Sequence, residues 1–368
     1  MRSWKTSVFL LLMCCIFLSG AKPDDRLAAE LGQNLIVGIP GKVLDKGTIR
    51  ILRYIKPAGV ILFRWNYGSA AQFKSLIAQL QKVSNEDTGY PYFIMIDEEP
   101  AGAMRIGLFR NILISDPTYR DPTEKNIKIS DIPDWDAIEK NIKILSDTGV
   151  NVDLAPLADF PFTGEAFIKK RVPAKNVDDL KEFNSRFIVL LKKHGISATL
   201  KHFPGIGTYV ADPHKKVVYS DMDNETLEES MGIFKDGIDS GAGFVMTSHG
   251  IYRKIDPEHS ATFSPYIVNE LLKSKLDFRG IIITDDLSGM PLGKGREDRL
   301  AEAGLEALQA GHHMVLLAHG LERAEKVFNK MLVRIERDPA LQKLIRNNHQ
   351  KVIDIKKKKH LFSLKKSL

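Results

Sequence analysis

The chain is poor in cysteine. Of its 368 residues only Cys14 and Cys15 are cysteines, and both lie in one apolar stretch near the start. If that stretch is removed, the remaining chain has to fold without disulfides or thiolate metal ligands, so its stability must come from the size of its core. The stretch itself, from Val8 to Leu18, is shorter than the roughly 20 apolar residues that span a bilayer.

The first 21 residues have the layout of a cleaved export signal. Two positive charges, Arg2 and Lys5, precede the apolar run, and the small residues Ser19-Gly20-Ala21 follow it. We therefore expect cleavage after about Ala21 and an exported protein, periplasmic or extracellular, with no stable membrane span after cleavage. A retained anchor and a lipoprotein signal are the alternatives.

The net charge of +7 comes from 53 basic and 46 acidic residues, and part of the excess lies at the far end, in Lys356 to Lys359 and Lys365-Lys366. A basic tail can bind an anionic surface. A solvated, frayed terminus is the simpler interpretation. Because the chain carries an export signal, we do not expect a nucleic acid as partner.

Short apolar, β-branched runs recur along the chain, and amphipathic helical patterns fall between most of them, as expected for parallel strands joined by helices. The eight predicted strands are Leu35–Ile39, Gly59–Phe63, Tyr92–Asp97, Asn151–Ala155, Ala198–His202, Gly243–Ser248, Ile281–Asp285 and His313–Ala318. The clearest predicted helices are Ala70–Asn85, Trp135–Asp147, Val177–Lys192, Glu225–Asp239, Ser264–Lys275 and Glu297–Gln309, with a further helical region from about Leu321 to Ile355.

Eight strand–helix units predict an α/β fold, a single (β/α)₈ barrel over about residues 22–335, followed by a basic helical tail over 336–368. Several predicted helices end on a glycine shortly before the next strand, at Gly149, Gly195, Gly241 and Gly311, where a left-handed residue would turn the chain back. No glycine-rich dinucleotide fingerprint follows the first strand, which argues against a doubly wound nucleotide-binding sheet.

In such a barrel the active site forms at the carboxyl ends of the strands. Charged and polar residues gather at five of these ends. They are Asp97-Glu98-Glu99, Asp159, Lys201-His202, Ser248-His249 and Asp285-Asp286. Caps and loop salt bridges would explain any single one of them, but five together favour a catalytic site.

Two segments resemble the signatures of glycoside hydrolase family 3, specifically its β-N-acetylhexosaminidase branch. They are Lys201-His202-Phe203-Pro204-Gly205, with Asp212-Pro213-His214 downstream, and Ile283-Thr284-Asp285-Asp286-Leu287. The resemblance spans nearly the whole chain to about residue 320. It implies a retaining exo-β-N-acetylglucosaminidase that acts on cell-wall or chitin-like oligosaccharides, a substrate containing N-acetylglucosamine, and no metal or other cofactor.

The resemblance also implies the roles of individual residues. Asp285 matches the nucleophile, whose attack would form a covalent glycosyl-enzyme. His214, on the loop after the fifth strand, matches the general acid/base, and Asp212 would orient it. Asp286 is the rival nucleophile, although it is better placed to cap the turn that follows. The residues expected to bind the sugar are Asp97, Arg105, Arg171, Lys201 and His202, for which a buried ion-pair network is the alternative.

The chain departs from the family pattern at several positions: Ile206, Gly102, Pro213 and Gly289. Gly205 and Gly207 would let the catalytic loop swing, whereas Pro213 would restrict it. These departures leave other functions open. The alternatives are a β-glucosidase or xylosidase of the same family, a phosphorylase, because a histidine acid/base repels phosphate less than a carboxylate does, and a carbohydrate-binding protein with impaired catalysis. The oligomeric state stays open as well.

Overall fold

The computed structural model describes residues 25–108, 135–164, 166–212, 216–290 and 296–358. The predicted export signal and the last ten residues lie outside these ranges. Within them, none of the helices combines the length and the apolar character needed to cross a bilayer.

Eight parallel strands close into one barrel, in the order in which they occur in the chain. The strands are β1 (Leu35–Gly38), β2 (Gly59–Leu62), β3 (Phe93–Ile96), β4 (Val152–Asp153), β5 (Ser197–Phe203), β7 (Phe244–Thr247), β10 (Ile281–Asp286) and β11 (Met314–Leu317). Closure is made by the pairing of β1 with β11, in which Leu35 is opposite Val315. The predicted (β/α)₈ barrel is therefore confirmed, and each of the eight predicted strands is present.

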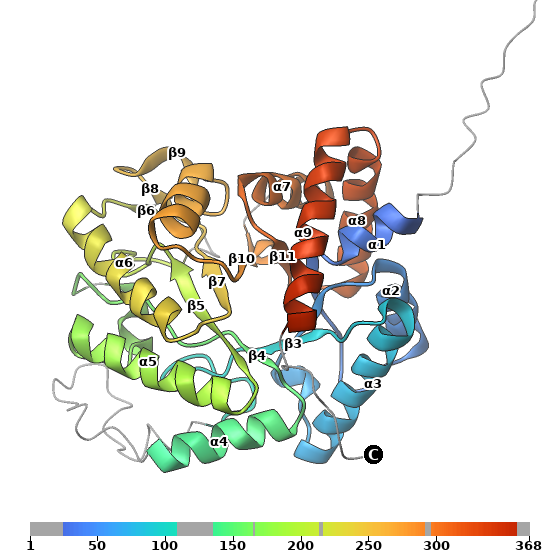
Figure 1. Cartoon of the computed structure of the whole chain (residues 1–368), viewed down its shortest axis with the longest axis horizontal. Helices are drawn as coiled ribbons and strands as arrows, with labels where there is room; N and C mark the ends of the chain where they lie inside the picture. The colour runs from blue at the N-terminus through green and yellow to red at the C-terminus, as the bar shows by residue number, and fades with distance from the viewer. Residues whose placement is uncertain (1–24, 109–134, 165, 213–215, 291–295, 359–368) are drawn as a thin grey trace, which may run out of the picture.

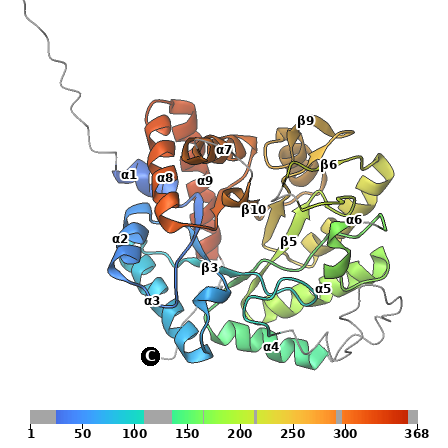
Figure 2. The same cartoon turned by 180° about the vertical axis from the view of Figure 1, so that it is seen from behind.

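Helices surround the barrel (Figures 1 and 2). They are α1 (Asp25–Gly32), α2 (Lys46–Ile55), α3 (Ala70–Thr88), α4 (Trp135–Asp147), α5 (Val177–Lys193), α6 (Asn224–Asp239), the π-helix η5 (Tyr266–Lys275), α7 (Arg296–Ala310), α8 (Leu321–Ile335) and α9 (Pro339–Lys358). The four glycines expected to end helices all have positive φ, from 77° at Gly195 to 120° at Gly311. A left-handed residue at each of these points turns the chain back toward the next strand.

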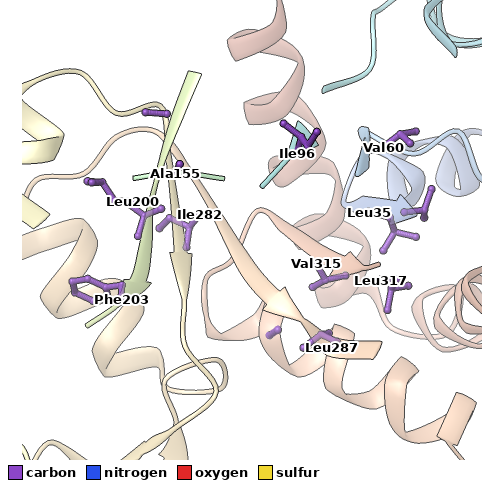
Figure 3. Close-up of a cluster of buried hydrophobic side chains, with 14 of the residues drawn as sticks. Leu35, Val60, Ile96, Ala155, Leu200, Phe203, Ile282, Leu287, Val315 and Leu317 are labelled. Carbon is purple, nitrogen blue, oxygen red and sulfur yellow. The ribbon is translucent and has the colours of Figure 1, made fainter. Parts of the chain in front are cut away.

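Alternating side chains of the strands serve two separate cores. In β1, Leu35 and Val37 belong to the outer cluster beneath the helices, and Ile36 between them belongs to a cluster inside the barrel. Figure 3 shows part of the outer cluster, with Val60, Leu200, Ile282 and other labelled strand residues. The alternation follows from the two-residue repeat of a strand, and it explains why β1, β2, β3 and β11 are apolar on both faces.

The first and last helices lie side by side, α1 beside α8 and α9 in both views (Figures 1 and 2). Helix α9 contributes Val352 to the cluster inside the barrel, where Phe93 at the start of β3 also belongs. Lys356 is only 4% exposed, and its Nζ lies 5.1 Å from the ring of Phe93. The prediction of a solvated basic terminus is therefore wrong for Lys356, because α9 closes the amino-terminal end of the barrel.

Several elements lie outside the predicted set. Helices α1 and α2 are two of them, and the others form a small sheet of β6 (Tyr219–Ser220), β8 (Ile251–Tyr252) and β9 (Asp256–Ser260). Short 3₁₀ turns follow three strands: η1 (Arg64–Asn66) after β2, η4 (Phe167–Arg171) in the segment after β4, and η6 (Leu287–Gly289) after β10.

Candidate active site

A cavity of about 630 Å³ lies at the carboxyl ends of the barrel strands. Among its lining residues are Asp97, Arg105, Arg171, Lys201, His202 and Asp285, which are six of the eight residues that the sequence predicts for the site. They come from the ends of β3, β5 and β10 and from η4, so segments far apart in the chain meet here. A concave, partly polar cavity of this size can hold a small polar ligand.

Asp97 is the centre of one half of a charged network. Its Oδ1 accepts a hydrogen bond from Lys201 Nζ at 2.7 Å. Its Oδ2 accepts two from Arg105, through Nη2 at 2.9 Å and Nε at 3.2 Å. Both lysine and carboxylate are buried, so the charges are held in place by each other and not by water.

Glu99 is the centre of the other half and was not among the predicted site residues. Its Oε1 lies 2.8 Å from Lys201 Nζ, and Arg171 reaches the carboxylate through Nη2 at 2.5 Å and Nε at 3.1 Å. Gly102, one of the departures from the family pattern, lies against this pair. A Cβ there would be 1.9 Å from Glu99 Oε2, so a larger residue would have to displace the Glu99 carboxylate from its present position beside Arg171.

The network keeps its members ionised. Burial alone would raise the pKa of Asp97, but the charges of Lys201 and Arg105 outweigh it and hold that pKa below its usual value. For Glu99 the same opposition, with Lys201 and Arg171 as the cations, lowers the pKa to about 2. Burial would lower the pKa of Lys201, yet the two carboxylates raise it. These residues therefore form the buried ion-pair network that was the alternative to sugar binding. The network does not exclude sugar binding, because its charged groups line the cavity.

Two more carboxyl groups support the loop after β3. Glu98 is fully buried and accepts hydrogen bonds from the backbone N–H groups of Arg105, Ile106 and Leu108. Asp153, at the end of β4, accepts one from the backbone N–H of Glu98. Burial raises the pKa of Asp153 well above its usual value.

Asp285, the last residue but one of β10, faces the cavity, with 9% of its surface exposed. Its Oδ2 lies 3.9 Å from His202 Nε2, and its Oδ1 accepts a hydrogen bond from the backbone N–H of Asp286. The other ring nitrogen of His202, Nδ1, lies 2.8 Å from Asp159 Oδ2. Asp159 also accepts from the backbone N–H groups of His202 and Ile206, so it fixes the imidazole that faces Asp285.

Asp286 has the capping role expected of it. Its Oδ1 accepts from the backbone N–H of Ser288 at 2.9 Å and from that of Ala318 at 2.9 Å, which ties the end of β10 to the end of β11. Its Oδ2 lies 3.6 Å from Nε2 of His319, a cavity residue that the sequence did not single out. Asp285 is therefore the member of the pair whose carboxylate is not used as a cap.

The loop after β5 begins as a tightly packed segment. A Cβ at Gly207 would lie 1.6 Å from the carbonyl oxygen of Phe160, and Tyr252 donates its hydroxyl hydrogen to the carbonyl of Gly205 at 2.8 Å. Ile206 is buried, and its backbone N–H donates to Asp159. Gly205 has a φ of 125°, a conformation that favours glycine, and Gly207 allows close packing. That the loop swings stays a prediction.

Asp212, further along this loop, is half-buried. His214 and Pro213 fall in 213–215, outside the described residues, so the pairing of Asp212 with His214 stays a prediction. In the described ranges no group of three or more His, Cys, Asp or Glu side chains is arranged to hold a metal ion.

Residues 38–354 match the family model described as the N terminal domain of glycosyl hydrolase family 3. Among similar sequences, a beta-hexosaminidase of Methylobacillus flagellatus is 28% identical over 316 residues, which cover 85% of this chain and 86% of that one. A beta-hexosaminidase of Xylella fastidiosa is 29% identical over 289 residues, covering 77% and 83%.

Solved structures have the same fold. The beta-N-acetylhexosaminidase from Beutenbergia cavernae superposes with a TM-score of 0.73 at 24% identity, over 90% of this chain and 98% of that one. A family 3 beta-N-acetylglucosaminidase from Paenibacillus gives a TM-score of 0.75 at 21% identity; the match covers 90% of this chain and 62% of the Paenibacillus chain.

Proposed function

The chain belongs to glycosyl hydrolase family 3, and we propose that it is a retaining exo-β-N-acetylglucosaminidase that removes terminal N-acetylglucosamine from cell-wall or chitin-like oligosaccharides. The observation that carries the proposal is the position of Asp285. This carboxylate, next to the end of β10, lines the same cavity as the charged network of Asp97, Lys201 and Arg105. The names of the relatives support the choice of sugar.

The proposed reaction has two steps. Asp285 attacks the anomeric carbon of the bound sugar, and His214 gives a proton to the departing oxygen, so a glycosyl-enzyme forms with one inversion. Water then attacks the same carbon while His214 takes a proton from the water, the bond from that carbon to Asp285 breaks and releases the carboxylate, and this second inversion restores the original configuration. Asp212 would set the orientation of His214.

The charged side chains of the cavity would hold the sugar. Asp97 offers acceptor oxygens, and Arg105, Arg171 and Lys201 offer donors, in fixed positions that suit ring hydroxyls. Because these groups are already paired with each other, they need little rearrangement when the sugar binds. A preorganised polar site stabilises a charged transition state more than water does.

The test uses the protein without its first 21 residues. We expect it to release nitrophenol from 4-nitrophenyl N-acetyl-β-glucosaminide faster than from the β-glucoside or β-xyloside, and the first product to be the β-anomer by proton NMR. Asp285→Asn should lower kcat by about 10⁴-fold or more with an unchanged melting temperature. Asp221→Asn, which changes an exposed aspartate, is the matched control.

Other outcomes would favour the alternatives. Faster turnover of the glucoside or xyloside would give a different sugar specificity, and turnover that needs inorganic phosphate would make the protein a phosphorylase. Sugar binding without turnover of any glycoside would make it a carbohydrate-binding protein. An active Asp285→Asn protein would refute the assignment of the nucleophile.

We also propose that the protein acts outside the cytoplasm, on the basis of the charged, apolar and small-residue segments of residues 1–21. Cell fractionation followed by sequencing of the mature N-terminus tests this. A new N-terminus near residue 22 in the exported fraction is expected, and a full-length protein in the cytoplasm would contradict the proposal.

A further inference from the structure

Three aromatic side chains form a continuous shelf at the rim of the cavity. We call Phe63, Trp65 and His319 the rim shelf. The ring centroids of Phe63 and Trp65 are 4.4 Å apart with an angle of 17° between their planes. The imidazole of His319 stacks on Phe63 at 5.2 Å and lies 5.7 Å from Trp65. The shelf therefore joins the end of β2 to the end of β11.

Polar contacts hold the two outer rings in place. Trp65 donates its indole N–H to the carbonyl of Ile39 at 3.1 Å. The backbone N–H of His319 donates to Ser288 Oγ at 3.0 Å, and its Nε2 lies 3.6 Å from Asp286. A rigid aromatic surface loses little conformational freedom when a ligand binds to it.

The shelf is exposed, although it is fixed. Trp65 is 45% exposed, and the side chain of His319 is 50% exposed, whereas Phe63 beneath them is only 5% exposed. Phe63 is an apolar part of the wall of the cavity that contains Asp285. The exposed ring of Trp65 adds apolar surface that nothing in the described part of the chain covers, and such surface beside a polar cavity is typical of ligand sites.

Trp65 stands between two hollows. Phe63 and His319 line the cavity that contains Asp285. Trp65 lines a second hollow of about 750 Å³, together with residues of the loops after β1, β2 and β3 that include Tyr67 and Ile106. A ligand that extends out of the cavity past Phe63 meets Trp65 and has open space beyond it.

From this arrangement we propose that the rim shelf is a subsite for a second sugar ring, the one on the leaving-group side of the scissile bond. This rests on the proposed function, since an exo-acting enzyme holds the terminal sugar in the cavity and leaves only the leaving group at the rim. One face of a β-linked pyranose consists of C–H groups, which pack on the face of an indole ring. Trp65 then determines specificity, favouring sugar-ring leaving groups over small ones.

The experiment compares a leaving group that has a ring with one that has none. The substrates are N,N′-diacetylchitobiose and methyl N-acetyl-β-glucosaminide, and the measured quantity is the ratio of their kcat/KM values. Trp65→Ala should lower this ratio by roughly three- to tenfold, as expected for the loss of one aromatic contact. Trp65→Phe should keep the ratio within about twofold of wild type, because a flat ring remains.

Tyr54→Ala is the control, since Tyr54 is an exposed aromatic residue, 41% exposed, on α2 and away from the cavity. It should leave the ratio unchanged. An unchanged ratio in Trp65→Ala would overturn the proposal. So would a loss that is equal for both substrates, because that pattern indicates a structural role for Trp65.

A binding measurement separates this proposal from the proposed function. Calorimetry on the Asp285→Asn protein gives Kd values for the disaccharide and the methyl glycoside without turnover. Adding Trp65→Ala should weaken disaccharide binding by a similar factor relative to the methyl glycoside. If the wild-type protein hydrolyses neither compound, the proposed hydrolase activity fails, and the Kd ratio still supports or overturns the shelf.

Discussion

Lys356→Met should stabilise the protein at neutral pH. Lys356 lies at the amino-terminal end of the barrel, 4% exposed, and its Nζ donates to Gln33 Oε1 at 2.9 Å. Within the described part of the chain no carboxylate is paired with it. Burial lowers its pKa from the usual value near 10.5 to about 7. The protonated lysine is therefore costly in the folded protein.

The size of the effect follows from the two pKa values. Each pH unit between them corresponds to roughly 1.4 kcal/mol, so the charged lysine costs on the order of 5 kcal/mol at pH 7 or below. Methionine removes this cost, but it leaves Gln33 Oε1 without its donor, which costs about 1–3 kcal/mol. We expect a net gain of about 2–4 kcal/mol at pH 7.

The pH dependence gives the sharper test. Between about pH 7 and pH 10.5 the unfolded chain binds a proton at Lys356 that the folded protein does not, so wild-type stability from this group rises with pH over that range. Lys356→Met lacks this contribution, and its advantage should shrink as the pH rises. Urea unfolding of both proteins at pH 7 and pH 9.5 measures it.

Lys357→Met serves as the control, because Lys357 is the exposed neighbour on the same helix. It should change stability by less than about 0.5 kcal/mol. The reasoning is refuted if Lys356→Met is less stable than wild type at pH 7, or if its stability difference from wild type is the same at both pH values.

Two further predictions concern titratable groups in or beside the barrel. Burial lowers the pKa of His313 from 6.5 to about 3, so its contribution to stability is full above pH 6.5 and is lost as pH falls toward 3. His313→Asn keeps an acceptor for the backbone N–H of Ile282 and should flatten acid unfolding over that range, unlike exposed His259→Asn; equal acid curves would contradict this. Lys201→Met should destabilise the fold by roughly 3–5 kcal/mol and abolish turnover, because Asp97 and Glu99 lose their shared cation. Exposed Lys74→Met is the control, and a stable, active Lys201→Met protein would refute the role of the network.

The barrel strands could be predicted from the sequence because most of them are short apolar runs, as expected of strands that are buried on both faces. Gly59–Leu62 and Phe93–Ile96 are apolar runs of this kind, and the flanking turn residues mark their ends. The four helix-ending glycines added an independent signal. Helix α2 was missed although its sequence carries a signal of a different kind. Asp45 caps its start by accepting a hydrogen bond from the backbone N–H of Thr48.

The small sheet could not be predicted in this way. β9 consists of Asp256–Ser260, which has neither apolar alternation nor β-branched residues, and it pairs with β8. β6 pairs with β8 over about thirty residues of intervening chain, which includes helix α6 and strand β7. Such strands form because the surrounding barrel brings them together, so tertiary contacts and not local propensity decide them.

The candidate site was predictable in position but only partly in composition. The strand-end rule located Asp97, Lys201, His202 and Asp285 together. It also gathered Glu99 at the end of the third strand, but it could not show that this side chain pairs with Lys201 and Arg171. Trp65 and His319 lie on turns after strands, where no motif or periodicity indicates the direction of a side chain.

Buried charged groups are paired at one end of the barrel and unpaired with carboxylates, within the described residues, at the other. The pH dependence of stability should therefore differ from that of sugar binding. At the mouth, Asp97, Glu99 and Lys201 are paired, and their pKa values move so that each stays charged. At the amino-terminal end, Lys356 contacts a neutral acceptor, Gln33, and the ring of Phe93, with no carboxylate paired to it in the described residues, and its pKa falls to about 7. As the pH rises above 7, Lys356 therefore loses its charge, while the three groups of the network at the cavity stay charged. Stability should increase over a range of pH in which the charges proposed to hold the sugar do not change.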